Sequence, residues 1–175
     1  YSSSCSSNNN NTTTTTTNIK EVITKNRDEI ETTFMLMNHY GLKKDHLNRP
    51  ILNHIVYFLS RKDFLTPILS VRYTFNNSPQ NVSNYLLKTF EEEYWYFISF
   101  EEKKNIEEIF KKVHDTKKKN LDDFSTDDLK KLSSLLNITV YNTMKRKTII
   151  EKLNEKMKEM KNFSNHVFSL LHDFV

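Results

Sequence analysis

The sequence has few of the residues that shape turns. It contains one glycine and three prolines among 175 residues, whereas sheet proteins need turn residues at regular spacing. Pro50, Pro67 and Pro79 each follow a polar residue that suits a helix start: Asn48 two positions earlier, and Thr66 or Ser78 directly before. This scarcity and placement predict an all-α protein.

Cysteine and long apolar runs are scarce as well. Cys5 is the only cysteine, which excludes a disulfide framework and a cysteine-based metal site. The densest apolar run, Tyr94–Phe100, is far shorter than the ~18 residues that cross a bilayer. We therefore expect no membrane partner. The aromatic content of this run would suit a short strand, but the sequence offers no obvious partner strand, so we interpret it as helical.

Residue patterns typical of catalysis are missing too. A single glycine cannot build a phosphate-binding loop, and the six histidines never occur at metal-ligand spacing. The acidic run Glu91–Glu93 could supply paired carboxylates, but such runs are more often a solvated helix face. We predict no enzyme, no metal site and no cofactor.

The first 18 residues, YSSSCSSNNNNTTTTTTN, offer almost no apolar surface, and we predict that they are disordered. No acidic residue precedes Glu21, which is compatible with the end of an organelle transit peptide, although arginine is missing. The first residue is Tyr1 rather than Met, which indicates a fragment or a processed form. The expected location is a plastid-like or mitochondrial organelle, with the cytoplasm or nucleus as the alternative.

Apolar residues recur at helical spacing from Ile19 onward, and Gly41 stands where a left-handed C-terminal cap would end the first helix. Ser99 with Glu102 fits a capping box at the start of a later helix. Ser164 could cap a last one. The predicted organisation is a tail (1–18), an irregular helical body (19–113), a linker (114–120), a small two-helix module (121–158) and a terminal helix (164–175).

The module has two short apolar-patterned segments. Ser125 and Asp128 make a capping pair for the first, whose predicted apolar face comprises Leu129, Leu132, Leu135 and Leu136. Asn137 can adopt the left-handed conformation that ends this helix. An extended joint follows from Ile138 to Thr143, and the second helix presents Ile149, Ile150 and Leu153 to the first.

This pattern resembles the Rho_N module, the small helical domain at the N-terminus of the bacterial transcription terminator Rho, and the related SAP helix-extended-helix motif. The resemblance covers about 35 residues, a fifth of the chain. It departs at Asn137, where the family usually has glycine, and the joint lacks the family's frequent glycine. The positions that match are Leu129, Leu132, Leu136, Ile138, Tyr141, Met144, Lys145, Arg146, Ile149, Ile150 and Leu153.

The resemblance implies nucleic-acid binding, and charge agrees with it. Residues 111–162 hold 14 Lys or Arg and 8 Asp or Glu, within a chain of net charge +4. A basic block beside a slightly acidic body suits a polyanion, although a lysine-rich solvated surface would look the same. Three cations at a helix start oppose the helix dipole, which favours compensation by an outside anion. The candidate contacts are Lys130, Lys131, Tyr141, Asn142, Lys145, Arg146, Lys147 and Lys152.

The predicted function is therefore a non-catalytic accessory protein that binds RNA, or DNA as second choice, in association with a ribosome or nucleoid. Tyr141 would stack on an unpaired base, and the cations would bind backbone phosphates. The alternative is a helical protein–protein interaction or structural subunit of a larger assembly, in which the basic residues meet acidic neighbours and Tyr141 packs on the helices.

Overall fold

The structure, a computed structural model, describes residues 19–92 and 99–174, and within these ranges it contains helices and no strand. This confirms the all-α fold. The predictions for the tail 1–18 and for most of Tyr94–Phe100 lie outside the described residues. A helical segment occupies residues 19–25. The helices that follow are α2 (Arg27–His39), α3 (Arg49–Ser60), α4 (Thr66–Asn76), α5 (Val82–Glu92), α6 (Phe100–Thr116), α7 (Thr126–Leu135) and α8 (Arg146–Phe174), with 3-10 turns η1 (Lys44–His46) and η3 (Leu121–Asp123).

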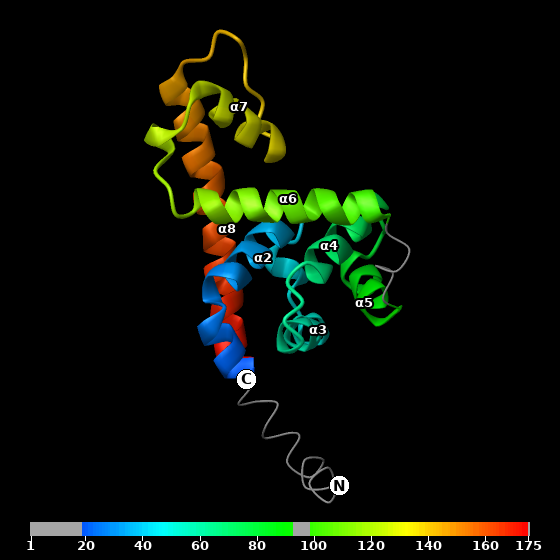
Figure 1. The fold of residues 1–175 in the computed structure, drawn as a ribbon. Helices are drawn as coiled ribbons and strands as arrows, with labels where there is room; N and C mark the ends of the chain where they lie inside the picture. Colours follow the sequence, from blue (N-terminus) through cyan, green and yellow to red (C-terminus); the bar gives the residue numbers. More distant parts are fainter. Residues whose placement is uncertain (1–18, 93–98, 175) are drawn as a thin grey trace, which may run out of the picture.

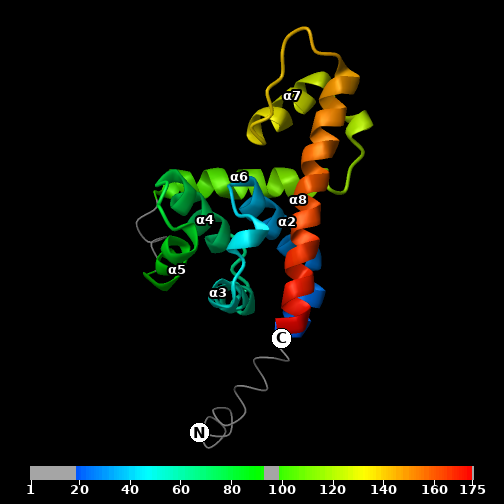
Figure 2. The same cartoon turned by 180° about the vertical axis from the view of Figure 1, so that it is seen from behind.

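Helix α8 runs the length of the molecule and organises it (Figure 1). Its second half lies along α2, which is its most extensive helix–helix contact. Helices α3 to α5 lie to one side of this pair, and α6 crosses above them. Helix α7 lies beside the first half of α8, beyond α6, and the reverse view shows the same arrangement (Figure 2).

Several predicted helix starts are confirmed. The Asn48 side chain accepts a hydrogen bond from the Ile51 amide at 3.0 Å, and Ser99 Oγ accepts one from the Glu102 amide at 3.1 Å. The start predicted at Ser78–Pro79 is wrong, because α5 begins only at Val82. There the Asn81 side chain accepts a hydrogen bond from the Asn84 amide, so asparagine does the capping two residues beyond the proline.

Gly41 ends the first helical region as predicted. Its φ is +124°, in the region where residues with a side chain are strained. A Cβ at this position would also lie 2.7 Å from Cδ1 of the Phe75 ring. Backbone conformation and packing against α4 therefore both require glycine here.

The predicted linker is shorter and more firmly anchored than expected. Helix α6 continues to Thr116, so residues 114–116 are helical. The next residue, Lys117, has a side chain only 5% exposed, and its Nζ lies 2.8 Å from Oε1 of Glu31 on α2. The same Nζ donates a hydrogen bond to the Asp28 carbonyl at 2.7 Å. The connection is thus attached to the body where it leaves α6.

The separate terminal helix predicted at Ser164 is wrong. Helix α8 continues for 29 residues without a break, and Ser164 is fully buried inside it. The apolar residues around Ser164 fall on one face of the same helix and are buried, so they extend α8 along the body. One helix therefore belongs to both the module and the body.

The two regions also meet at His39, near the end of α2. Lys156 of α8, Arg72 of α4 and the main-chain carbonyl of Leu135 in α7 all lie close enough to act on its ring. Burial, followed by the two cations, lowers the pKa of His39 to about 4, while the carbonyl acts in the opposite direction. Neither ring nitrogen has a hydrogen-bond partner of good geometry among the described residues. His39 is therefore a neutral, half-buried histidine at the junction, with both ring nitrogens shielded from solvent.

Candidate nucleic-acid interface

Helix α7 begins and ends as its sequence predicts. Ser125 Oγ accepts a hydrogen bond from the Asp128 amide at 3.1 Å, which caps the first turn. At the other end Asn137 has φ +59°. The Asn137 amide donates to the Ser134 carbonyl and the Ile138 amide to the Ser133 carbonyl, at 3.1 and 2.8 Å. These two bonds are the Schellman motif, so asparagine here fills the position usual for glycine.

The core between α7 and α8 follows most of the predicted pattern. Leu129, Leu132 and Leu136 of the first segment and Ile149 and Leu153 of α8 are each at most 1% exposed. Ile150 is half-buried. Leu135 differs from the prediction and is 39% exposed. Because the α7 turn places Leu129, Leu132 and Leu136 against α8, the side chain at 135 points to another side of the helix.

The joint between the two helices carries the exposed aromatic side chain. Tyr141 is 64% exposed, and Asn142 beside it is exposed as well. The Met144 amide donates to the Tyr141 carbonyl at 2.9 Å, which forms a turn at this point. Ile138, Val140 and Met144 pack on the core from the joint. The joint is thus held at three points and forms the loop at the end of the module far from the body (Figure 1). The Tyr141 side chain on this loop is exposed to solvent.

Arg146 has a structural role that its sequence context did not reveal. Its guanidinium donates hydrogen bonds to the carbonyls of Asp122, at 2.7 Å, and of Phe124. These carbonyls belong to η3 and to the residue just before the Ser125 cap. Arg146 therefore fastens the start of α8 to the start of α7, and a phosphate would have to compete with these bonds.

The three consecutive cations at the start of α8 do not form one patch. Successive residues of a helix point about 100° apart, so Lys145 and Lys147 lie on opposite sides of Arg146. Lys152, seven residues after Lys145, shares its side. Glu151 and Glu155 lie between this side and the side of Lys147. The first half of α8 therefore has two basic edges separated by an acidic stripe.

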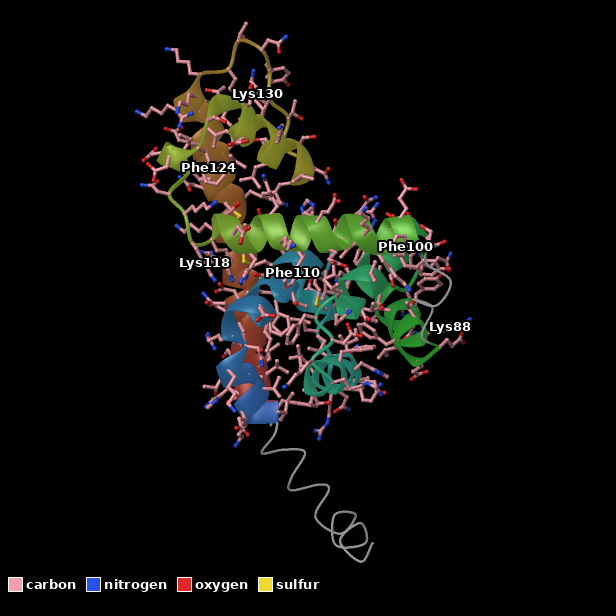
Figure 3. The ribbon with its side chains drawn as sticks, viewed as in Figure 1. Lys88, Phe100, Phe110, Lys118, Phe124 and Lys130 are labelled. Atoms are coloured by element: carbon pink, nitrogen blue, oxygen red, sulfur yellow. The ribbon has the colours of Figure 1, made fainter. Side chains whose placement is uncertain are left out.

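The two lysines of α7 also lie apart. Lys131 lines a groove between α7 and α6, where its neighbours include Asn105, Glu108 and Lys112 of α6. Lys130 is exposed on another side of α7, labelled in Figure 3. The α6 residues of the groove were assigned to the body from the sequence. These α6 residues lie beside the module only because α7 packs over α6, and no local sequence pattern predicts this packing.

Among the described residues, none of the candidate lysines forms an ion pair. Within residues 19–92 and 99–174, the ion pairs involve other residues, and Lys130, Lys131, Lys145, Lys147 and Lys152 have no carboxylate partner. All five are exposed. The structure thus presents Tyr141, Asn142, Lys145 and Lys147 around the joint, with Lys152 further along one edge. It places Lys131 in a separate groove and engages Arg146 internally.

Other kinds of site find little support in the described part of the chain. No three His, Cys, Asp or Glu side chains there come together as metal ligands. No helix there is both long and apolar enough to cross a membrane. None of the family models, curated proteins or solved structures compared with the chain matches it. The comparisons therefore leave the resemblance to Rho_N untested.

Proposed function

We propose that the protein is a non-catalytic nucleic-acid-binding protein, with single-stranded RNA as its first ligand and DNA as its second. The observation that carries this proposal is the end of the module, where an exposed tyrosine lies beside exposed lysines that form no ion pair among the described residues. The resemblance to Rho_N supports the same function. It also underlies our proposals of an organelle location and of association with a larger ribonucleoprotein.

The chemistry of the joint suits an unpaired strand. An aromatic ring offers a stacking surface for any base, and lysines neutralise backbone phosphates. The side chain of Lys145, directly before α8, has only donor groups, so it cannot cap the free amides of the first helical turn. An anion at this position would meet both those amides and the lysines.

The test is a titration of the full chain with single-stranded RNA, single-stranded DNA and duplex at several salt concentrations. Lys145→Gln with Lys147→Gln should flatten the log–log salt dependence by about 1.4, since each phosphate contact on a single strand contributes a slope of about −0.7. The matched control is Lys88→Gln with Lys104→Gln. These two exposed lysines lie on α5 and α6 (Lys88 is labelled in Figure 3), and their replacement should leave the slope unchanged.

Tyr141→Ala separates stacking from charge. It should weaken binding by roughly 1–3 kcal/mol with little change in slope, as the loss of a stacking platform does. A wild-type protein that shows no salt-sensitive binding to any of the three nucleic acids contradicts the proposal. The module would then serve protein assembly, in which case neither the lysine variants nor Tyr141→Ala would alter nucleic-acid binding.

A further inference from the structure

A second candidate site lies at the other end of α8, where the helical segment 19–25 packs beside the C-terminal end of α8 (Figure 1). A pocket of about 310 Å³ opens there. Its position is more than 20 residues along α8 from the joint, which corresponds to about 30 Å at a rise of about 1.5 Å per residue. The residues that line it are Lys20, Ile23, Thr24, Arg27, Phe168, Leu171 and His172.

The charge of this pocket distinguishes it from others on the described part of the chain. Among the described residues, Lys20, Arg27 and His172 line it and no carboxylate does. Four other pockets of comparable size each include at least one aspartate or glutamate. Phe168 and Leu171, both buried, give the pocket an apolar floor. Cations thus border an apolar surface, and no carboxylate of the described residues lines the pocket with them.

Arg27 is held in position for an anion. Its guanidinium carbon lies 4.0 Å from the centroid of the Phe168 ring, a cation–π contact that restrains the side chain. Glu31, one turn further along α2, pairs with Lys117 instead. Within the described residues, Arg27 has neither a hydrogen-bond acceptor nor an ion-pair partner. A planar guanidinium with free donors suits a carboxylate, which it can bind through two hydrogen bonds.

We propose that this pocket binds a small carboxylic acid with an apolar body, in the class of a medium-chain fatty acid. The carboxylate would meet Arg27 and Lys20, and the apolar body would cover Ile23, Phe168 and Leu171. The volume lies at the small end of the range for ligand pockets. The walls are helical and offer no strand edge to an extended peptide.

The test is calorimetric titration of the full chain with decanoate, decanol and decyltrimethylammonium, all below their micelle concentrations. Decanoate should bind, and the neutral and cationic probes should bind at least ~10-fold more weakly, since a hydrogen bond to a charged group contributes about 1.5–3 kcal/mol. Arg27→Gln should weaken decanoate binding to a similar degree. The control is Arg49→Gln, which removes an exposed arginine 5.7 Å from the Phe174 ring, outside the pocket.

Three outcomes would overturn the proposal: no decanoate binding, equal binding of decanoate and decanol, or equal affinity in wild type and Arg27→Gln. Thr24→Trp gives a second test because its bulk would occupy the pocket from an exposed position. It should abolish decanoate binding, and retained binding places the ligand elsewhere. The RNA affinity of Arg27→Gln and Thr24→Trp should equal that of the wild type. A negative result with decanoate is therefore distinguishable from failure of the proposed function.

Discussion

The two halves of α8 are one continuous helix but have different surroundings. The second half packs along α2 and buries Met160, Phe163, Val167, Phe168 and Leu171. The first half packs on the short helix α7, and its other sides carry exposed charges. Burial on this scale is the main source of stability, so the second half holds the fold together. The first half supports a small module and leaves a charged surface free.

This difference explains how a small two-helix module is stabilised. Two short helices bury little area and are marginal alone. Here one of them is the extension of a helix that the body already fixes. The Arg146 hydrogen bonds and the Lys117 ion pair fasten the remaining connections. Part of the predicted linker is helical, and Lys117 attaches the connection to the body.

The largest expected effect is in the second half of α8. Phe168 packs edge-on against Phe34 of α2, with ring centroids 5.1 Å apart. Phe168→Ala should lower the free energy of unfolding by about 3–5 kcal/mol, as large-to-small aromatic changes in cores do. Urea denaturation measures the loss. The control is Asn165→Ala on the exposed side of the same helix, which should change stability by less than about 0.5 kcal/mol. A similar loss in both variants would contradict the burial argument.

The next effect concerns the first half and its partner α7. Leu132 is fully buried, and Leu132→Ala should cost about 2–4 kcal/mol, through lost burial and a residual cavity. Hydrogen exchange should accelerate over residues 126–153 while α2 and the second half of α8 stay protected, because these have their own contacts.

Leu135→Ala is a matched control for Leu132→Ala, since the same residue type in the same helix is 39% exposed at this position. Its cost should stay below about 1 kcal/mol. Simultaneous loss of protection in body and module in the Leu132→Ala protein would show that the two regions unfold as one unit.

Local signals in the sequence predicted the fold class and most helix ends. Side-chain capping depends on neighbours within three or four positions, so Asn48, Ser99 and Ser125 could be identified without a structure. The prediction of a helix start at Ser164 was wrong because a serine before apolar residues gives the same sequence pattern whether it starts a helix or lies buried inside one. Continuity of α8 depends on packing against α2, which is distant in sequence.

The candidate site shows the same limit. The exposure of Tyr141 and of the lysines agrees with their polar surroundings in the sequence. The role of Arg146 did not emerge, since its acceptors are backbone carbonyls more than 20 residues earlier. Every residue has a main-chain carbonyl, so residue types do not indicate which carbonyls Arg146 binds. The separation of Lys131 into the α6 groove likewise depends on how α7 docks.

The smallest of these effects concerns the junction of the two regions at His39. The folded state lowers the pKa of His39 to about 4, while an unfolded histidine has a pKa near 6.5. Above pH 6.5 the residue is neutral in both states and its effect on stability is absent. As pH falls below 6.5, the unfolded state binds the proton first, so folding becomes less favourable until the folded state also protonates near pH 4. By linkage, the loss at pH 5 is about 2 kcal/mol.

His39→Leu should remove that part of the pH dependence of the free energy of unfolding. Urea denaturation at pH 7 and pH 5, where most carboxylates remain ionised, measures it. His166→Gln on α8 serves as the control and should keep the wild-type loss. If His39→Leu loses as much stability as the wild type between these two pH values, the ring is not held neutral between α2, α7 and α8, and the junction is looser than its burial indicates.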